Sequence, residues 1–256
     1  MLILLPPSRT MFSPAAGAPY SPAALSFASV ADVAALRSEV AAAYVSVCSA
    51  PDGAKRLGLT ARQAAELPEL ALLGSRPALP AGRAYTGVLY AAAGIEALTE
   101  PGTQRAGLEV LIASALYGWV RPSDVIAPYR LTMGSSILDR PLAAAWREAA
   151  SAVLAAKSTG RLTLDCRSGE YQAAAPAKAC SGEYLALKAV TVRDGAEKTV
   201  SHFAKHYRGV LTGALVELAA GRDLSGFGAD DVAQVAATLP EVKDVRLTPG
   251  TLTLVV

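Results

Sequence analysis

Runs of hydrophobic residues divide the chain into short strands that alternate with longer helices. Residues 2–5 form an uninterrupted apolar run that Pro6 and Pro7 stop, which is typical of a buried strand ending in a loop. Runs rich in Val, Leu and Ile predict further strands over 109–115 and 162–166. Apolar residues at helical spacing predict helices over residues 30–47, 88–98, 141–156, 203–220 and 229–239.

The C-terminal third contains segments in which apolar and polar residues alternate, as they do in half-buried strands. Residues 184–193 and 198–202 flank the turn dipeptide Asp-Gly at 194–195 and predict a hairpin. A second hairpin is predicted around the Pro-Gly pair at 249–250. Strands that interleave with helices and also form hairpins indicate an α/β fold with α+β character, in which helices surround a mixed sheet.

Residues 51–73 carry a separate helical signature. Thr60 and Gln63 have the capping-box spacing, so a helix is predicted from residue 61 to about residue 73, although Pro68 can kink it. Gly58 could close a helix–hairpin–helix unit, in which a glycine lets backbone N–H groups approach a DNA phosphate. An ordinary turn between two helices accounts for the same residues and is the commoner case.

Composition limits the classes of partner. The 256 residues are 52% hydrophobic and carry a formal net charge of +2, and no linker or repeat divides them, so we expect a single compact domain. A nucleic-acid binder that uses its whole surface usually has more positive charge, so an anionic partner must be held by a local cluster. The three cysteines lie far apart, and neither a signal peptide nor a membrane span is evident; we therefore expect a cytoplasmic protein with no membrane partner.

Four polar segments follow predicted strands or precede predicted helices: residues 8–10, 85–87, 114–134 and 168–171. The longest crowds arginines, tyrosines, prolines and glycines into a stretch that we expect to be irregular. Ligand groups collect beyond the carboxyl ends of strands in α/β sheets, and loops on a rigid scaffold often carry function. We therefore expect the four segments to converge on one basic cleft, with scattered connections as the alternative.

Several charged residues suit contact with an anion. Arg121 and Arg130 carry planar guanidinium groups that can bind phosphate or carboxylate in a bidentate manner, although Asp124 could pair with either arginine and brace the loop. Lys205 and Arg208 are three residues apart and share one face near the start of a predicted helix. The helix dipole disfavours cations there, which indicates an anion close by; a solvated basic face is the alternative.

Catalytic and metal-binding patterns are weaker. Glu170, with Ser168 beside it, could act as an acid or base, but a single carboxylate specifies no reaction. His202 and His206 are four residues apart, yet no third ligand is evident, so we expect no metal site. The chain has no phosphate-binding loop, no complete dinucleotide fingerprint and no nucleophile elbow, so no cofactor is expected.

Five motifs, spread over residues 1–227, together resemble one known family. They are Met-Leu-Ile-Leu-x-x-Pro-x-Arg-Thr at 1–10, Tyr-Thr-Gly at 85–87, Leu-Tyr-Gly-x-x-Arg-Pro-x-Asp-x-x-x-Pro-Tyr-Arg-Leu-x-Met-Gly at 116–134, Ser-x-Glu-Tyr at 168–171, and Phe-Ala-Lys-x-x-Arg-Gly at 203–209. They resemble the YaaA family of bacterial peroxide stress proteins. Arg83 departs from the aspartate that many members carry, and the tail from Gly228 onward departs from the usual ending.

The resemblance implies a single-domain fold with a basic cleft, sequence-independent binding of double-stranded DNA, and protection of DNA by limiting iron-dependent peroxide damage. The family's helix–hairpin–helix element would correspond to residues 51–73. The DNA- or anion-binding residues would be Arg9, Thr10, Tyr85, Tyr117, Arg121, Tyr129, Arg130, Tyr171, Lys205 and Arg208. The alternative is an enzyme that acts on a nucleotide, nucleobase or other small anion in the same cleft, with Glu170 and Ser168 as catalytic residues.

Overall fold

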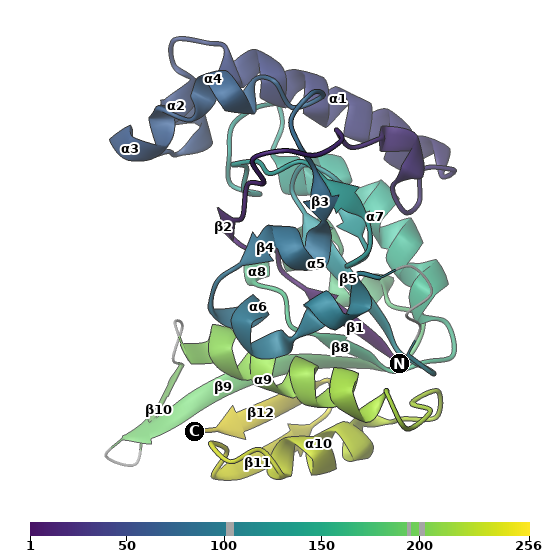
Figure 1. Cartoon of the computed structure of the whole chain (residues 1–256). Coiled ribbons are helices and arrows are strands. Elements are labelled where there is room, and N and C mark those ends of the chain that lie inside the picture. The colour runs from purple at the N-terminus through teal and green to yellow at the C-terminus, as the bar shows by residue number, and fades with distance from the viewer. Residues whose placement is uncertain (101–104, 194–195, 200–202) are drawn as a thin grey trace.

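The fold is built on a mixed sheet (Figure 1). The computed structural model describes residues 1–100, 105–193, 196–199 and 203–256. Across the sheet, the strands of this part of the chain lie in the order β11 (Asp244–Thr248), β12 (Thr251–Val255), β9 (Tyr184–Arg193), β8 (Thr163–Asp165), β1 (Leu2–Leu5), β5 (Glu109–Ser114) and β6 (Gly118–Val120), and β10 (Ala196–Thr199) pairs with β9. The five from β12 to β5 are parallel, and β6, β10 and β11 are antiparallel additions. The predicted fold class is confirmed.

β1 is an inner strand of the sheet, between β8 and β5. All four of its residues, Leu2–Leu5, are fully buried, because helices cover both faces of a parallel sheet and its strands can then be apolar throughout. The chain leaves β1 for β5 on one side and later returns to β8 on the other. Such a reversal of strand order opens a crevice at the carboxyl ends of the strands.

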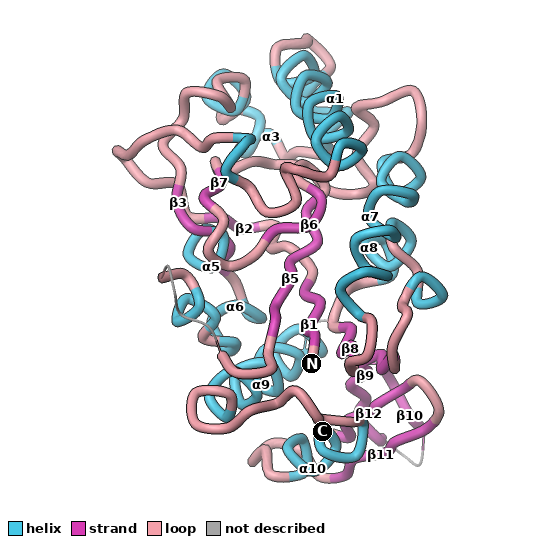
Figure 2. Tube along the Cα trace, turned by 90° about the vertical axis from the view of Figure 1, so that its right-hand side faces the viewer, coloured by secondary structure: helices cyan, strands magenta, loops and turns pink. Residues whose placement is uncertain are grey.

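Helices cover the two faces of the sheet, as Figure 2 shows. α7 (Leu142–Ser158) and α8 (Gly169–Ala174) lie on one face, and α6 (Val88–Ala93) and α9 (Phe203–Leu218) lie on the other. α10 (Ala229–Ala237) packs against α9 and β11 at the far end of the sheet. Another group of helices lies at the top of Figure 1: α1 (Ala31–Cys48), α2 (Gly53–Leu57), α3 (Ala61–Ala64) and α4 (Leu67–Leu70).

Short elements join these layers. Two small antiparallel pairs form, one between β2 (Thr10–Met11) and β4 (Tyr85–Thr86) and one between β3 (Leu79–Pro80) and β7 (Val125–Ile126). The chain also contains the short helices η1 (Pro22–Ala24), α5 (Ala81–Ala84), η2 (Ile95–Leu98) and η3 (Ala177–Ala179). The expectation that residues 114–134 are irregular is therefore wrong in part, because β6 and β7 both lie within that segment.

Proline and glycine explain two other differences from the predicted helices. The helix predicted over residues 61–73 is divided into α3 and α4, because Pro68 lacks an N–H and lies in the first turn of a new helix. The helix predicted over 88–98 ends at Ala93, since Gly94 takes a left-handed conformation with φ +57°. The capping box of Thr60 and Gln63 is present as expected.

The two predicted hairpins are present. β9 and β10 pair antiparallel, although β10 covers Ala196–Thr199, and residues 194–195 and 200–202 lie outside the described residues. β11 and β12 form the second hairpin, with Gly250 at φ +72° in its turn. β12 then pairs in parallel with β9, so the C-terminal tail completes the sheet.

Gly118 supplies a test of the packing between β6 and α7. It has φ +67°, and a Cβ at this position would lie 2.7 Å from the ring of Trp146. Gly118→Ala combines backbone strain with overpacking, so we expect it to lower the free energy of unfolding by about 2–4 kcal/mol. Gly160→Ala is the matched control, because Gly160 has φ +70° but open space around it; its cost should be about 1 kcal/mol. Equal losses in urea unfolding would contradict the close packing against Trp146.

Candidate functional site

The loop that follows β1 begins the candidate site at the carboxyl edge of the sheet. The hydroxyls of Ser8 and Thr10 both donate hydrogen bonds to the carbonyl oxygen of Thr86, the second at 3.0 Å. Gly87 permits this approach, since it has φ +108° and a Cβ there would lie 3.0–3.1 Å from the two hydroxyl oxygens. Two of the predicted segments, 8–10 and 85–87, are therefore joined.

A network of buried hydroxyl groups links the ends of β4 and β5 to the long loop. The Tyr129 hydroxyl forms hydrogen bonds with the Ser114 hydroxyl (2.7 Å) and the Tyr85 hydroxyl (2.8 Å). Ser114 Oγ also accepts the backbone N–H groups of Leu116 and Tyr117 at 3.2 and 3.0 Å. Buried polar groups are costly unless they are paired, so this network holds the loop in one conformation.

The four tyrosines proposed for the site are buried in the protein interior. Tyr85, Tyr117, Tyr129 and Tyr171 are each at most 6% exposed. The Tyr117 hydroxyl donates to the Ala127 carbonyl at 3.0 Å, and its ring packs edge-to-face on Tyr129 at 5.4 Å. These side chains hold the loops in place from the protein interior. A ligand at the surface would therefore contact neighbouring residues and not the tyrosines themselves.

Arg130 pairs with a carboxylate and braces the loop, as the alternative interpretation expected. The carboxylate belongs to Glu66, however, and not to Asp124. The Arg130 guanidinium group donates to both carboxylate oxygens of Glu66 at 2.9 and 3.0 Å and to the Arg9 carbonyl at 2.9 Å. Asp124 instead accepts the backbone N–H of Arg121 at 2.9 Å and the Ser26 hydroxyl at 2.8 Å. Arg130 thus connects the α3–α4 segment to the loop after β1.

Arg121 does not join this group. β6 runs antiparallel to β5, so the chain returns towards the amino end of β5 before it reaches Arg121. There the guanidinium group of Arg121 pairs with Glu109 at 2.8 Å. The expected convergence of Arg121 with Arg9 is therefore wrong, because the reversal of β6 carries it to the opposite edge of the sheet.

A hollow of about 370 Å³ opens at the carboxyl edge, between the loop after β1, the α2–α3 turn and residues 129–136. Four basic residues line it: Arg9, Lys55, Arg56 and Arg130. The Arg56 guanidinium donates to the Ser136 carbonyl at 2.9 Å, whereas Lys55 and Arg9 are exposed. Sequence reasoning did not select Lys55 and Arg56 as site residues, although their position just before Gly58 was the available signal.

The α2–α3 turn has the geometry expected of a helical hairpin. Gly58 takes φ +65° between the two helices, and a Cβ there would meet nothing within 4 Å, so the turn is open to solvent. Thr60 begins α3 with its capping box. The turn therefore exposes backbone directly beside Lys55 at the rim of the hollow.

The end of β8 is held by a buried ion pair that the sequence reasoning missed. Arg167, which follows the strand predicted over 162–166, is 1% exposed and pairs with Asp165 at 2.7–2.9 Å. It also donates to the carbonyl oxygens of Tyr171 and Ala175, so it fixes α8 to the sheet. The sequence did contain a signal for this ion pair: Arg167 comes two residues after an aspartate that ends an apolar strand.

The first turn of α8 and the start of α9 contribute exposed groups. Ser168 and Glu170 are both exposed, and so is Lys205. Arg208 is half-buried, and its Nε is a buried donor that has no hydrogen-bond partner in the described part of the chain. Burial raises the pKa of Cys166, at the end of β8, to about 12, and the charge of Arg208 opposes that rise. Arg208 therefore lies beside the carboxyl end of β8.

The two histidines do not form a metal site in the described residues. His202 lies outside them, and His206 forms a 3.1 Å contact with Glu241. Within the described ranges no group of three His, Cys, Asp or Glu residues could hold a metal ion. No helix in those ranges is both long enough and apolar enough to cross a membrane.

Comparison with known proteins identifies the family. The profile of the family described as peroxide stress protein YaaA matches residues 1–230. The chain belongs to this family. It is similar to UPF0246 proteins from Corynebacterium efficiens (35% identity over the whole of both chains), Streptomyces coelicolor (35% identity over 84% of this chain and 83% of the relative) and Corynebacterium glutamicum (32% identity over the whole of both chains).

The YaaA-family resemblance seen in the motifs is thereby confirmed. The matched range ends within α10, so β11 and β12 lie beyond it, which agrees with the divergent tail noted in the sequence. The Corynebacterium efficiens relative nevertheless covers the whole chain, including that hairpin.

The buried tyrosines predict how stability depends on alkaline pH. Burial raises the pKa values of Tyr85, Tyr90, Tyr117 and Tyr129 well above 10. In the unfolded chain these phenols ionise near pH 10, while the folded protein keeps their protons. The stability that the neutral phenols provide is therefore complete below pH 10 and is lost as pH rises above it. Tyrosinate absorbance should rise together with unfolding; ionisation of these four residues near pH 10 in the folded protein would contradict their burial.

Proposed function

We propose that this protein binds double-stranded DNA without sequence preference through the carboxyl edge of its sheet and so contributes to protection against peroxide damage. The observation that carries the proposal is the hollow where the loop after β1 meets the α2–α3 turn, lined by Arg9, Lys55, Arg56 and Arg130. The family's description as peroxide stress proteins supports the physiological setting.

The distribution of charge supports a local contact with phosphates. The net charge of the whole chain is only +2, so attraction has to come from a cluster. Arg9 and Lys55 are exposed cations on two adjoining segments, while the charge of Arg130 is engaged by Glu66. The exposed turn at Gly58 adds backbone that can approach a phosphate closely.

The start of α9 supplies further cations in this proposal, outside the lining of the hollow. The helix begins on the side of the molecule where β2 and α3 lie, the left in Figure 1. Lys205 is exposed in its first turns, and Arg208 lies beside the end of β8. The unfavourable position of Lys205 relative to the helix dipole is offset when a phosphate lies nearby.

In this proposal, binding to DNA phosphates also lowers the iron-dependent damage to DNA. Cations that neutralise DNA phosphates release the counterions condensed on the duplex. Ferrous ions held on DNA are among those counterions, and their release moves peroxide chemistry away from the strands. In this proposal the protein therefore protects DNA by occupying phosphates.

A second candidate function is an enzyme that acts on a nucleotide, nucleobase or other small anion. The hollow of about 370 Å³ lies within the size range of small-molecule sites. The exposed Glu170 and Ser168 follow β8 at the same edge of the sheet, where they would serve as acid–base groups. Mononucleotide binding that Arg9→Ala with Lys55→Ala weakens, together with weak binding of duplex, would favour this candidate.

Removal of two exposed cations tests the DNA-binding proposal. For the double variant Arg9→Ala and Lys55→Ala, each lost phosphate contact should lower the slope of log affinity against log salt by about 0.9, a total of about 2. Affinity should fall about tenfold at physiological salt and equally for unrelated duplex sequences, since phosphate contacts carry no base information. Fluorescence anisotropy with labelled duplexes gives both quantities.

Lys243→Ala is the matched control, because it removes an exposed lysine beside β11, at the far end of the sheet. Its affinity and salt slope should equal those of the parent protein. Adding Lys205→Ala to the double variant should lower the slope further. A parent protein that binds duplex weakly, with a flat response to salt, would refute the proposal.

A further inference from the structure

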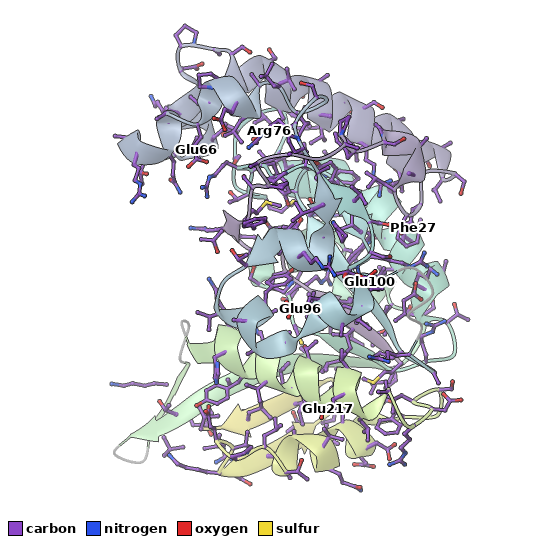
Figure 3. All side chains as sticks on the ribbon, viewed as in Figure 1. Phe27, Glu66, Arg76, Glu96, Glu100 and Glu217 are labelled. Carbon is purple, nitrogen blue, oxygen red and sulfur yellow. The ribbon has the colours of Figure 1, made fainter. Side chains whose placement is uncertain are left out.

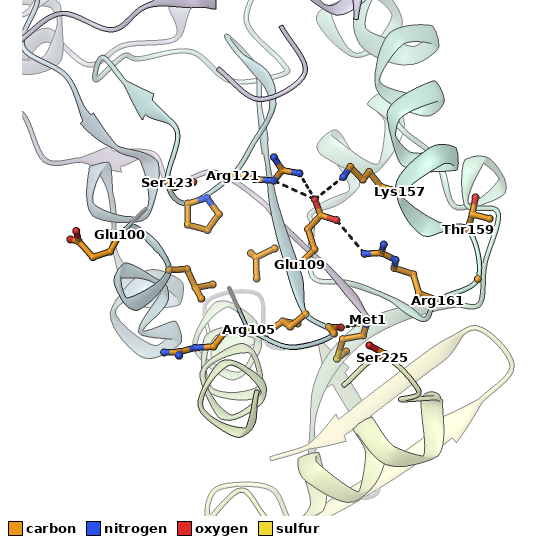
Figure 4. Close-up of a pocket in the computed structure, with 16 residues that line it drawn as sticks. Met1, Glu100, Arg105, Glu109, Arg121, Ser123, Lys157, Thr159, Arg161 and Ser225 are labelled. Atoms are coloured by element: carbon orange, nitrogen blue, oxygen red, sulfur yellow. Dashed lines mark hydrogen bonds and ion pairs between the residues drawn. The ribbon is translucent and has the colours of Figure 1, made fainter. Parts of the chain in front are cut away.

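A second and larger hollow, of about 720 Å³, lies at the amino edge of the sheet. Figure 4 shows its wall of charged side chains around Glu109, the first residue of β5. Phe27, which packs on this wall, and Glu66, which belongs to the carboxyl-edge site, lie on opposite sides of the molecule in Figure 3. This hollow is therefore separate from the surface proposed to bind DNA.

Three cations share one carboxylate in this wall. Glu109 contacts Arg121 at 2.8 Å, Lys157 at 3.0 Å and Arg161 at 3.2 Å, and its side chain is only 17% exposed. Burial alone would raise the pKa of Glu109, but the hydrogen bonds from Arg121 and Lys157 outweigh it and lower that pKa, so the carboxylate stays charged. Two positive charges of the cluster thus remain without a counter-charge on Glu109.

Neighbouring carboxylates are already occupied. Glu100, the other carboxylate that lines the hollow, pairs with Arg83 at 2.6 Å. The negative charge of Asp124 acts on the buried Arg37, where it opposes the lowering of that arginine's pKa by burial, and its carboxylate accepts hydrogen bonds from the Ser26 hydroxyl and the Arg121 backbone N–H. The surplus charge therefore faces the hollow.

Phe27 holds two of the cations in place. Its ring centroid lies 5.6 Å from the guanidinium carbon of Arg121 and 5.7 Å from Nζ of Lys157. Phe27 also has φ +65°, and in the described part of the chain it is the one non-glycine residue with positive φ. Such a conformation costs of order 1–3 kcal/mol and persists where the surroundings over-determine it, commonly at ligand sites. The cations are thus pre-organised before any ligand arrives.

The rest of the lining limits the class of ligand. Leu108, Val110 and Pro122 supply apolar surface, and Ser123 and Thr159 supply hydroxyl groups. A phosphate monoester carries a charge of about −2 near neutral pH, which matches the surplus, and arginine binds its oxygens in a bidentate manner. The volume suits an ester of nucleotide size.

We propose that the amino-edge hollow is a binding site for a small phosphate monoester, whose phosphate is held by Arg121, Lys157 and Arg161 and whose organic part lies on the apolar wall. Glu109 is a positioning residue, because it gathers the three cations without needing to touch the ligand. The proposal is independent of DNA binding at the other edge.

Calorimetry on the full chain at physiological salt tests the proposal, with adenosine 5′-monophosphate as the probe and adenosine and inorganic phosphate as its controls. We expect the nucleotide to bind with a dissociation constant below about 1 mM, adenosine not to bind, and inorganic phosphate to bind more weakly. An excess of duplex DNA should leave nucleotide binding unchanged. Absence of nucleotide binding, or its displacement by duplex, would overturn the assignment.

Substitutions of the lining cations test whether the nucleotide binds in the amino-edge hollow. Lys157→Ala with Arg161→Ala should weaken nucleotide binding at least about tenfold while duplex affinity stays at the parent value. Arg140→Ala is the matched control, since Arg140 also pairs with a carboxylate, Glu39 at 2.8 Å, but does not line the hollow. If the double variant does not fold, Phe27→Leu keeps all three cations and should still weaken nucleotide binding. Unchanged binding in a folded variant would overturn the proposal.

Discussion

The parallel pairing of β1 on both sides is the constraint on which the rest of the structure depends. Its four residues, Leu2–Leu5, are fully buried, and their backbone groups pair with β5 and β8 at once. Because strand order reverses across β1, the segments after β1 and β8 must emerge side by side. The same pairing places Glu109 and Arg161 together at the opposite edge. The pairing of residues 2–5 thus sets the positions of both edges of the sheet at which the charged side chains lie.

Buried polar networks then give each edge its shape. Ser114, Tyr85 and Tyr129 share hydrogen bonds beneath the carboxyl edge, and Arg167 with Asp165 fixes α8 beside it. Loss of one partner would leave a buried donor or acceptor unpaired, which costs more than the bond itself contributes. The most distinctive family motif, residues 116–134, is therefore largely a structural loop, held in place by hydrogen bonds within it and to Tyr85, Ser26 and Glu66 outside it.

Two clusters of basic residues lie at opposite edges of the sheet in this nearly neutral protein. Arg9 and Lys55 lie exposed at the carboxyl edge, where an extended polyanion can reach them. Arg121 and Lys157 are held around one carboxylate and an aromatic ring within a concave wall, which suits a small anion. In the two proposals these clusters bind different anions, although their residue types are the same.

Most of the local elements and the family could be predicted from the residue pattern alone. The apolar run 2–5, the capping box at Thr60 and the turn at 249–250 act over a few residues, so their outcomes could be predicted. Only the tertiary structure decided that Arg121 leaves the carboxyl edge and that Arg130 pairs with Glu66. Those placements depend on the direction of β6 and on contacts between segments distant in the chain. No local pattern encodes them, because the energy that selects them arises from burial and charge pairing across the whole fold.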